Sequence, residues 1–255
     1  MICAERLREL MGDIARVEVF DLIDSTNTEA KRLAPTCAAS GKPVLIVAKE
    51  QTAGRGRMGR SFLSRADKGI FMSLLYFTSN GLSSAVSVTT ATAAIVAEEI
   101  EAVSGRPMKI KWVNDIYNDR GKVSGILAET LSVATDAFAV IVGIGINLGE
   151  DDFPEELRSV ASSIGDIDGK EELLISNVAK RIILHGEAPE NREYMQAYRE
   201  RFMLDGETVD LIRGGERIMS GRVVGVDDDG GLLLIPDGES DTISISSGEV
   251  SVRKK

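Results

Sequence analysis

The chain has 255 residues, 43% of them hydrophobic, which suffices for one large domain, or a large and a small one, around a sizeable core. Its formal net charge of −10 argues against general binding to nucleic acids or anionic membranes, because both depend on an excess of lysine and arginine. Two cysteines without a CxxC spacing and a single histidine, His185, argue against a disulfide framework, a zinc site and a Ser-His-Asp triad, and they favour a reducing cytoplasm. The N-terminus is charged too early for a signal peptide, and no apolar run reaches the ~18 residues of a membrane span.

A strand and a helix are expected at the start of the chain. Val17–Phe20 begins the strand, and the helix is expected over 24–34. Thr26 and Glu29 have the spacing of a capping box, which is one interpretation of the hydroxyl groups here. The other is that Ser25 and Thr26 face a site, where each hydroxyl can donate to and accept from a neutral polar ligand.

The next strand, predicted for Val44–Ala48, leads into the loop Gln51–Phe62, where three glycines and three arginines fall within seven residues. Glycines let backbone N–H groups approach a ligand closely, and arginines supply forked donors for carboxylate or phosphate. The glycine spacing also satisfies a dinucleotide-binding pattern and nearly satisfies a P-loop. Both motifs need a helix to follow, whereas the next apolar run, Ile70–Phe77, is strand-like. The loop therefore predicts an anion-binding site of another kind, and a solvated loop without a ligand is the alternative.

From residue 70 to residue 203, we expect strands and helices in mixed order along the chain. The expected order is a strand at 70–77, a small-residue helix at 83–103, a strand at 108–112, a hairpin turn at 118–121 leading to a strand at 122–130, a strand at 137–146, and helices at 171–184 and 190–203. Asn114 and Asp115 follow the strand at 108–112. They put an amide and a carboxylate at a strand end.

The pattern changes at Asp205-Gly206. From Glu207 on, short runs of valine, leucine and isoleucine alternate with turns rich in glycine and aspartate. This is typical of a small all-β barrel or sandwich of about 50 residues. We therefore expect two domains, residues 1–205 and 206–255.

Four motifs stand in order along the chain. They are Gly54-Arg55-Gly56-Arg57-Met58-Gly59-Arg60, Lys111-Trp112-Val113-Asn114-Asp115, Lys122-Val123-Ser124-Gly125-Ile126-Leu127 and Gly143-Ile144-Gly145-Ile146-Asn147. Together, at this spacing, they resemble biotin–protein ligases, the enzymes that attach biotin to a lysine of carboxylase carrier domains. The resemblance runs from Asp24 to the C-terminus. Two residues depart from the family's pattern. Val113 replaces a proline that is usual there. Phe62 keeps an aromatic residue at a position where tryptophan is often found.

The resemblance implies an α+β fold, with a mixed-sheet catalytic domain of the biotin/lipoate ligase type (class II synthetase-like) followed by a small SH3-like β-barrel. It implies that biotin and MgATP give biotinyl-5′-adenylate and pyrophosphate, after which an acceptor lysine attacks the mixed anhydride and AMP leaves. The implied ligands are biotin, ATP and Mg²⁺, with no metal site built from protein side chains. The implied partner is a biotin carboxyl carrier protein or the biotin domain of a carboxylase or decarboxylase.

The resemblance also assigns roles residue by residue. The catalytic residues would be Lys122, Arg57 and Asp115. The residues that bind biotin would be Ser25, Thr26, Asn27, Gln51, Gly54, Arg55, Gly56, Arg57, Lys122 and Gly125. The residues that bind the nucleotide would be Arg57, Arg60, Phe62, Trp112, Asn114, Lys122 and Asn147.

Charge supports these assignments independently. A biotin carboxylate and a triphosphate repel each other, and Lys122, Arg57, Arg55 and Mg²⁺ would neutralise that repulsion. Asp115 would orient or deprotonate the lysine ammonium, which is no nucleophile while it is charged. The simpler structural interpretations are a hairpin cap for Asp115 and a solvated strand end for Lys122.

Many members of the resembled family are also repressors, with a DNA-binding domain before the catalytic domain. Only 23 residues precede Asp24. A domain needs about 50 or more. We therefore expect no DNA-binding arm and no DNA partner, and a homodimer through the catalytic sheets is an expectation from the resemblance alone.

Two other functions remain open at this point. A lipoate–protein ligase or another acyl-adenylating ligase would share the catalytic fold, but lipoate has no ureido group and would not need Ser25, Thr26 and Gln51. A non-catalytic sensor of biotin or its adenylate would not need Lys122 together with Asp115.

Overall fold

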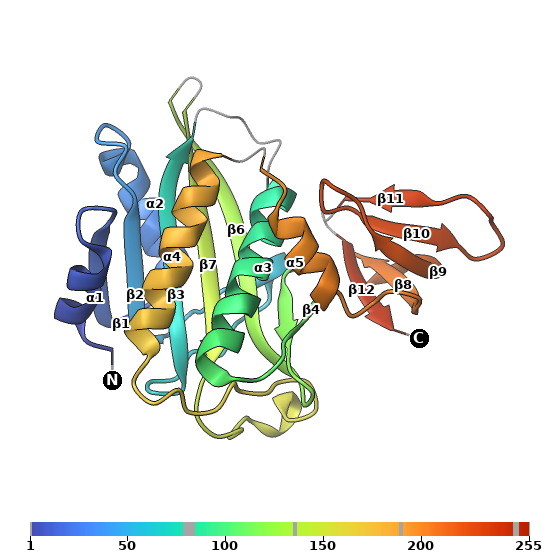
Figure 1. Ribbon diagram of the computed structural model, residues 1–255, viewed down its shortest axis with the longest axis horizontal. Coiled ribbons are helices and arrows are strands. Elements are labelled where there is room, and N and C mark those ends of the chain that lie inside the picture. Colours follow the sequence, from blue (N-terminus) through green and yellow to red (C-terminus); the bar gives the residue numbers. More distant parts are fainter. Residues whose placement is uncertain (1, 79–84, 135–136, 189–190, 247–249, 255) are drawn as a thin grey trace.

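The computed structural model describes residues 2–78, 85–134, 137–188, 191–246 and 250–254, and Figure 1 shows their arrangement. The helices are α1 (Ala4–Met11), α2 (Thr26–Cys37), α3 (Ala85–Ser104), α4 (Glu171–Glu187) and α5 (Tyr194–Arg201), with short 3₁₀ turns at Arg57–Gly59 and Glu155–Leu157. The strands are β1 (Arg16–Ile23), β2 (Val44–Gln51), β3 (Gly69–Thr78), β4 (Lys109–Lys111), β5 (Asp115–Tyr117), β6 (Lys122–Ala134), β7 (Ala137–Asn147), β8 (Thr208–Arg213), β9 (Glu216–Val226), β10 (Leu232–Pro236), β11 (Ile243–Ile245) and β12 (Val250–Lys254). Ser83 and Glu190, the predicted first residues of two helices, lie outside the described residues. Within these ranges, no helix combines the length and the apolarity needed to cross a membrane.

Seven strands form one mixed sheet in the order β1-β2-β3-β7-β6-β5-β4. β1 and β2 run parallel, and each other neighbouring pair of this sheet is antiparallel. The central strands β2, β3 and β7 are rich in β-branched and apolar residues and are buried along most of their length. Such sequences suit strands that are covered on both faces. The strands predicted at these three places are confirmed.

Helices cover the two faces of this sheet unequally. α1, α3 and α4 lie across one face, and α2 packs on the opposite face against β2, β3 and β7 (Figure 1). Successive strand residues point to opposite faces. Leu74 accordingly belongs to the apolar cluster under α3 and α4, while Leu75 packs with Ala30 and Ala34 of α2. Because α2 has 12 residues against 20 in α3, part of its face of the sheet is left without a helix.

Strands β8 to β12 form a second, antiparallel sheet in the order β11-β10-β9-β8-β12. Its buried residues, such as Leu211 and Leu234, belong to the same apolar cluster as the core under α3 and α4. The buried indole of Trp112 adds a polar link, since its Nε1–H donates to Gly230 O at 2.9 Å. The predicted α+β class is confirmed, and the second sheet fits an SH3-like barrel.

Two local predictions around α2 are wrong. The helix N-cap is Ser25, whose side chain makes no capping bond, and Thr26 is already inside the helix. The capping box fails because the Thr26 hydroxyl contacts Gln51 and Ser73 instead of the helix backbone. The helix also continues to Cys37, beyond the predicted end at residue 34, and Cys37 is buried in the cluster beneath α2.

The hairpin turn predicted at 118–121 is confirmed, with the Asn118 N–H donating to Gly121 O at 3.0 Å, but the strand before it is β5. The strand at 108–112 does not pair with β6, because the short strand β5 lies between them and pairs with both β4 and β6. Val113 and Asn114 therefore turn the chain between two strands of the sheet. This tight turn brings Asn114 and Asp115 to the sheet face that α2 leaves open.

Candidate functional site

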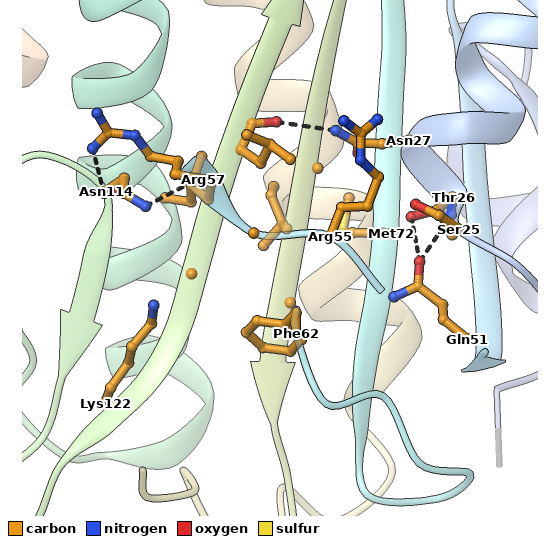
Figure 2. Close-up of a pocket in the computed structure, with 17 residues that line it drawn as sticks. Ser25, Thr26, Asn27, Gln51, Arg55, Arg57, Phe62, Met72, Asn114 and Lys122 are labelled. Atoms are coloured by element: carbon orange, nitrogen blue, oxygen red, sulfur yellow. Dashed lines mark hydrogen bonds between the residues drawn. The ribbon is translucent and has the colours of Figure 1, made fainter. Parts of the chain in front are cut away.

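A cavity lies on the face of the large sheet that α2 only partly covers (Figure 2). It is bounded by the start of α2, the end of β2, the loop after β2, and strands β3, β6 and β7. Its lining consists of Ser25, Thr26, Asn27, Gln51, Arg55, Gly56, Arg57, Phe62, Met72, Asn114, Lys122, Gly125, Ile126, Leu127, Gly143, Ile144 and Gly145. Segments that lie far apart in the sequence therefore meet here.

The floor of the cavity is a strip of sheet without side chains. Gly125 of β6 pairs directly with Gly145 of β7, and Gly143 lies two residues further along the same face. A Cβ at Gly145 would clash with the Phe62 ring, and one at Gly143 would clash with the Asn27 amide. The glycines are therefore what allows Phe62 and Asn27 to reach the sheet.

The loop that follows β2 folds over this strip as a compact lid, which we define as residues Gly54–Phe62. It is held by backbone hydrogen bonds from Gly56 N to Arg60 O at 2.7 Å and from Phe62 N to Gly54 O at 2.9 Å. Met58 and Gly59 have φ angles of 56° and 72°, in the left-handed region that favours glycine. The prediction that a strand, and not a long helix, follows this loop is confirmed by β3.

One end of the cavity is neutral and polar. The Thr26 N–H donates to Gln51 Oε1 at 2.8 Å, and Gln51 Nε2 donates to Ser64 Oγ at 2.8 Å, so the glutamine amide has a defined orientation. Ser25 and Thr26 are buried beside it at the start of α2. This end can form several hydrogen bonds with a neutral polar group of a ligand.

The opposite end is charged. Arg57 Nη1 donates to Asn114 Oδ1 at 3.0 Å, and Asn114 Nδ2 donates to Ile126 O at 2.9 Å. Lys122 Nζ forms an ion pair with Asp115 at 2.6 Å, and both side chains are half-buried. Figure 2 shows Arg57, Asn114 and Lys122 on one side of Phe62, and Ser25, Thr26 and Gln51 on the other.

Burial lowers the pKa of the Arg57 guanidinium, and the negative charge of Asp115 partly opposes that effect. An arginine side chain stays protonated even so. A cation that is poorly hydrated interacts strongly with an anion that replaces its lost water. Arg57 is therefore well prepared to bind a carboxylate or a phosphate.

A second cavity adjoins the charged end. Gly56, Arg57, Phe62, Asn114 and Lys122 line both cavities. The residues found only in the second are Met58, Arg60, Ser61, Lys111, Trp112, Asp115 and Val252, the last from the C-terminal sheet. Positive side chains surround the junction, so two anionic groups could meet there. Within the described residues, no cluster of acidic, histidine or cysteine side chains is suited to hold a metal ion.

The predicted site residues line one or both of these cavities, with the exceptions of Gly54 and Asn147. Gly54, the first residue of the lid, lies outside both linings, at a position where a Cβ would clash with Phe62 O. Asn147 also lies outside both linings, and its Nδ2 donates to Ser162 O at 2.9 Å. Trp112 lines the second cavity with little of its surface, since its ring is nearly fully buried against the C-terminal sheet.

Arg55 points away from the charged end of the cavity. Its Nη2 lies 3.4 Å from Glu129 Oε1, in an ion pair on the side of α2. Glu129 also accepts hydrogen bonds from Lys31 Nζ at 2.8 Å and from Asn27 Nδ2 at 2.9 Å. Arg55 thus joins the lid to β6 and α2, which differs from the predicted role of neutralising a triphosphate beside Lys122.

Three contributors to the site were not among the predicted residues. Ser73 is fully buried on β3 and contacts Thr26 and Asn27. The Phe62 ring packs on Gly145. Glu129 accepts a hydrogen bond from Asn27 and forms an ion pair with Arg55. The alternation of β6 could have indicated Glu129, which shares a strand face with Gly125. Nothing local could have indicated Ser73, because its partners come from a distant helix.

Burial by itself would raise the pKa of the Glu129 carboxyl. The hydrogen bonds from Lys31 and Asn27 and the charges of Lys31 and Arg55 outweigh burial, so the pKa is lowered overall. Glu129 is therefore an ionised carboxylate at neutral pH, and it acts only as a hydrogen-bond acceptor.

Comparison with known proteins gives a consistent result. The family model described as "Biotin/lipoate A/B protein ligase family" matches residues 19–147, and that of the "Biotin protein ligase C terminal domain" matches residues 206–253. The bifunctional ligase/repressor BirA of Bacillus subtilis is 35% identical over 235 residues, which is 89% of this chain and 70% of that protein. The biotin–[acetyl-CoA-carboxylase] ligase of Mycobacterium tuberculosis is 29% identical, over 95% of this chain and 92% of that protein.

Solved structures agree. The biotin protein ligase from Aquifex aeolicus in complex with biotin and ATP superposes with a TM-score of 0.74 at 30% identity. The match covers 94% of this chain and 99% of that one.

The contact between Phe62 and the bare strip can be tested by stability measurements. Gly145→Ala should lower the free energy of unfolding by about 1–3 kcal/mol, because the new methyl group overpacks the ring. In a Phe62→Ala background the same change should cost clearly less, since the clashing ring is gone. Urea unfolding followed by circular dichroism would measure both values. Gly56→Ala is the control, because its Cβ meets nothing closer than 3.4 Å. Additive costs of Gly145→Ala and Phe62→Ala would contradict the contact.

Proposed function

The chain belongs to the biotin/lipoate A/B protein ligase family, and from this we infer that it is an ATP-dependent ligase that activates biotin and attaches it to a lysine of a carrier protein. The observation that supports this most directly is the two-ended cavity. A neutral polar end built from Thr26 and Gln51 and a cationic end built from Arg57 and Lys122 face each other across the glycine strip. Biotin has the matching chemistry, a neutral ureido ring joined by an alkyl chain to a carboxylate.

Biotin would bind with its ureido group at the neutral end. Ser25, Thr26 and Gln51 supply hydroxyl and amide groups there, while the Phe62 ring that packs on Gly145 would form an apolar side of the pocket. Its carboxylate would then lie near Arg57 and Lys122, which is the position where an anion gains most from those charges. Asn27 and Arg55 would help to hold the lid and α2 in place around it.

The first step joins two anions. A carboxylate oxygen of biotin attacks the α-phosphorus of ATP, the bond to the bridging oxygen of the β-phosphate breaks, and pyrophosphate leaves. Arg57 and Lys122 line both cavities, so they can bind the carboxylate and the α-phosphate together and stabilise the charge that accumulates on phosphorus. ATP would enter with its own Mg²⁺ as the substrate MgATP. Arg60, Phe62, Asn114 and the exposed edge of Trp112 would line the nucleotide site.

The second step transfers the biotinyl group. The lysine nitrogen attacks the carbonyl carbon of the mixed anhydride, the bond between that carbon and the phosphate oxygen breaks, and AMP leaves. Asp115 lines the second cavity and forms an ion pair with Lys122. Its carboxylate would accept the proton that the incoming ammonium must lose before it can attack.

The C-terminal sheet would take part in this step through β12. Val252 of this strand lines the second cavity, which supports a role of the sheet in closing the nucleotide site or in seating the carrier protein. We propose residues 1–205 and 206–255 as the two domains. A homodimer stays a prediction. The proposed compartment is the cytoplasm, where ATP is available and free thiols such as Cys3 and Cys37 stay reduced.

Pyrophosphate–ATP exchange and carrier labelling would test the function. The protein should catalyse exchange of labelled pyrophosphate into ATP with biotin and much less with lipoate. With biotin, MgATP and a carboxylase carrier domain, intact-mass measurement should show addition of one biotinyl group to one lysine. Exchange with lipoate alone would contradict the biotin assignment in favour of a lipoate ligase. Binding of biotin without exchange would favour a non-catalytic sensor.

Lys122→Ala should reduce biotin-dependent exchange by about ten- to a hundredfold, because a charge-assisted contact in the transition state is lost. The fold should persist, since Lys122 is half-buried at a strand end. Lys49→Ala is a matched control, because it breaks a similar ion pair, with Asp21 at 2.7 Å, and neither residue lines a cavity. Equal exchange rates in Lys122→Ala and Lys49→Ala would remove Lys122 from the mechanism.

Arg57→Gly should release the biotinyl-adenylate about a hundredfold faster, because the lid loses its bond to Asn114 and its contact with the ligand's charge. The lid excludes water from a reactive anhydride, so a leaking variant should also label lysines of an unrelated protein such as albumin. The release rate and albumin labelling would be measured together.

Met58→Gly is the matched control for this experiment. Met58 is exposed in the same lid at a positive φ, so glycine there adds flexibility without removing a charge. It should release adenylate at a rate close to that of the parent. If Arg57→Gly releases no faster than Met58→Gly, Arg57 does not hold the lid closed.

A further inference from the structure

Four oxygen atoms form a continuous buried row at the neutral end of the cavity. Gln51 Oε1 lies 3.2 Å from Thr26 Oγ1, which lies 2.7 Å from Ser73 Oγ, which lies 2.6 Å from Asn27 Oδ1. Thr26, Ser73 and Asn27 are all at most 4% exposed. The row borders the cavity at Thr26, Asn27 and Gln51, and Ser73 lies behind it.

Neither end of the row can donate a proton. Gln51 Oε1 is identified as the amide oxygen because the Thr26 backbone N–H, which is only a donor, points at it. Asn27 Oδ1 is identified in the same way, because the other amide atom, Nδ2, faces Glu129 Oε2 at 2.9 Å and Leu127 O at 3.3 Å. Both of those partners are only acceptors, so the amide nitrogen must face them.

The row is consequently one proton short. It contains three close oxygen–oxygen contacts, while only the hydroxyl groups of Thr26 and Ser73 carry protons. Ser73 must donate to Asn27 and Thr26 then donates to Ser73, so the contact without a proton is the one between Thr26 Oγ1 and Gln51 Oε1. Gln51 Oε1 still accepts from the Thr26 N–H, and a donor from outside would bind to the lone pair of Thr26 Oγ1. The row therefore attracts a ligand that brings an N–H or O–H group, and it repels a ligand that brings another acceptor.

Glu129 is what keeps the row short of a proton. If the Asn27 amide turned over, Nδ2 would supply the missing proton to Ser73, but Oδ1 would then face the Glu129 carboxylate. Glu129 is held ionised by Lys31 Nζ at 2.8 Å and Arg55 Nη2 at 3.4 Å, and two acceptor oxygens at hydrogen-bond distance repel each other. The carboxylate lies outside the lining of the cavity, so it acts through Asn27.

We propose that Glu129 is a positioning residue that sets the hydrogen-bond polarity of the biotin pocket, so that the row Gln51–Thr26–Ser73–Asn27 accepts a ring N–H of the ureido group. The proposal rests on the proposed function, since it assigns the specificity of the same site. It goes beyond that function by naming a residue that does not touch the ligand. It also explains chemically how the pocket selects a cyclic urea over a ring without N–H, such as a dithiolane.

The test is calorimetric binding of biotin and of the two isomeric cyclic carbamates in which an oxygen replaces one ring N–H. The parent protein should bind one carbamate about tenfold or more weakly than biotin, because that isomer presents an acceptor to the row. In Glu129→Gln the Asn27 amide can turn over more readily, since glutamine can donate to Oδ1 and only the longer contact with Leu127 O at 3.3 Å still favours the present orientation. The ratio of the affinity for biotin to the affinity for that carbamate should then fall toward one, mainly because biotin binds more weakly.

Two variants separate this role from simple structural support. Lys31→Met removes a partner of Glu129 but leaves Asn27 facing a carboxylate, so it should preserve the ratio. Ser73→Ala cuts the row in the middle, so adding Glu129→Gln to it should no longer change the ratio. A Glu129→Gln variant that weakens biotin and the carbamate equally, or that acts equally with and without Ser73, would overturn the proposal. If the parent binds neither biotin nor the carbamates, the proposed function itself fails and the inference falls with it.

Discussion

The whole site depends on a strip of sheet that has no side chains. Gly125, Gly143 and Gly145 share one face of β6 and β7, and the Asn27 amide and the Phe62 ring occupy space that a Cβ at Gly143 or Gly145 would take. Sheet faces normally gain stability from cross-strand side-chain pairs, so a bare strip gives up packing at the centre of the domain. Here Phe62 and Asn27 supply part of that packing from the lid and from α2. The same strip then connects folding to ligand binding, since a ligand above it would contact backbone and the Phe62 ring.

Electrostatics divides the cavity into two chemically different halves. The chain is acidic overall, with a net charge of −10, yet the junction of the two cavities collects Arg57, Arg60, Lys111 and Lys122. At the other half, the charges of Arg55 and Lys31 are directed to Glu129 rather than to the cavity. An anion is therefore attracted to one end only, while the other end selects by hydrogen bonds. This division suits a ligand with one neutral and one anionic end, and it fixes the direction in which such a ligand binds.

The second sheet is part of the same physical unit. Its buried residues extend the core under α3 and α4, the Trp112 indole donates to Gly230, and Val252 reaches the second cavity. Trp112 and Asn114 lie within one short turn between β4 and β5, and Asp115 is the first residue of β5. One face of that turn therefore packs on the C-terminal sheet while the other carries groups of the charged end. Movement of the sheet relative to the turn would alter the position of Asp115 and Asn114, which links domain packing to the geometry of the site.

The sequence by itself determined the features that depend on local pattern. The apolar runs indicated the central strands, the change of pattern after residue 205 indicated an all-β end, and the glycine and arginine residues of the lid indicated an anion site. Arg57, Asn114 and Lys122, which line the cavity, could be singled out in advance because motif spacing is a property of the chain. Tertiary structure alone decided the direction of Arg55, the contact of Ser73 with α2, and the alignment of Glu129 with Asn27. These depend on which strands are neighbours and in what register, and a register is set by packing across more than 100 residues of chain. The insertion of β5 shows the same limit, because three residues are too few for a periodic signal.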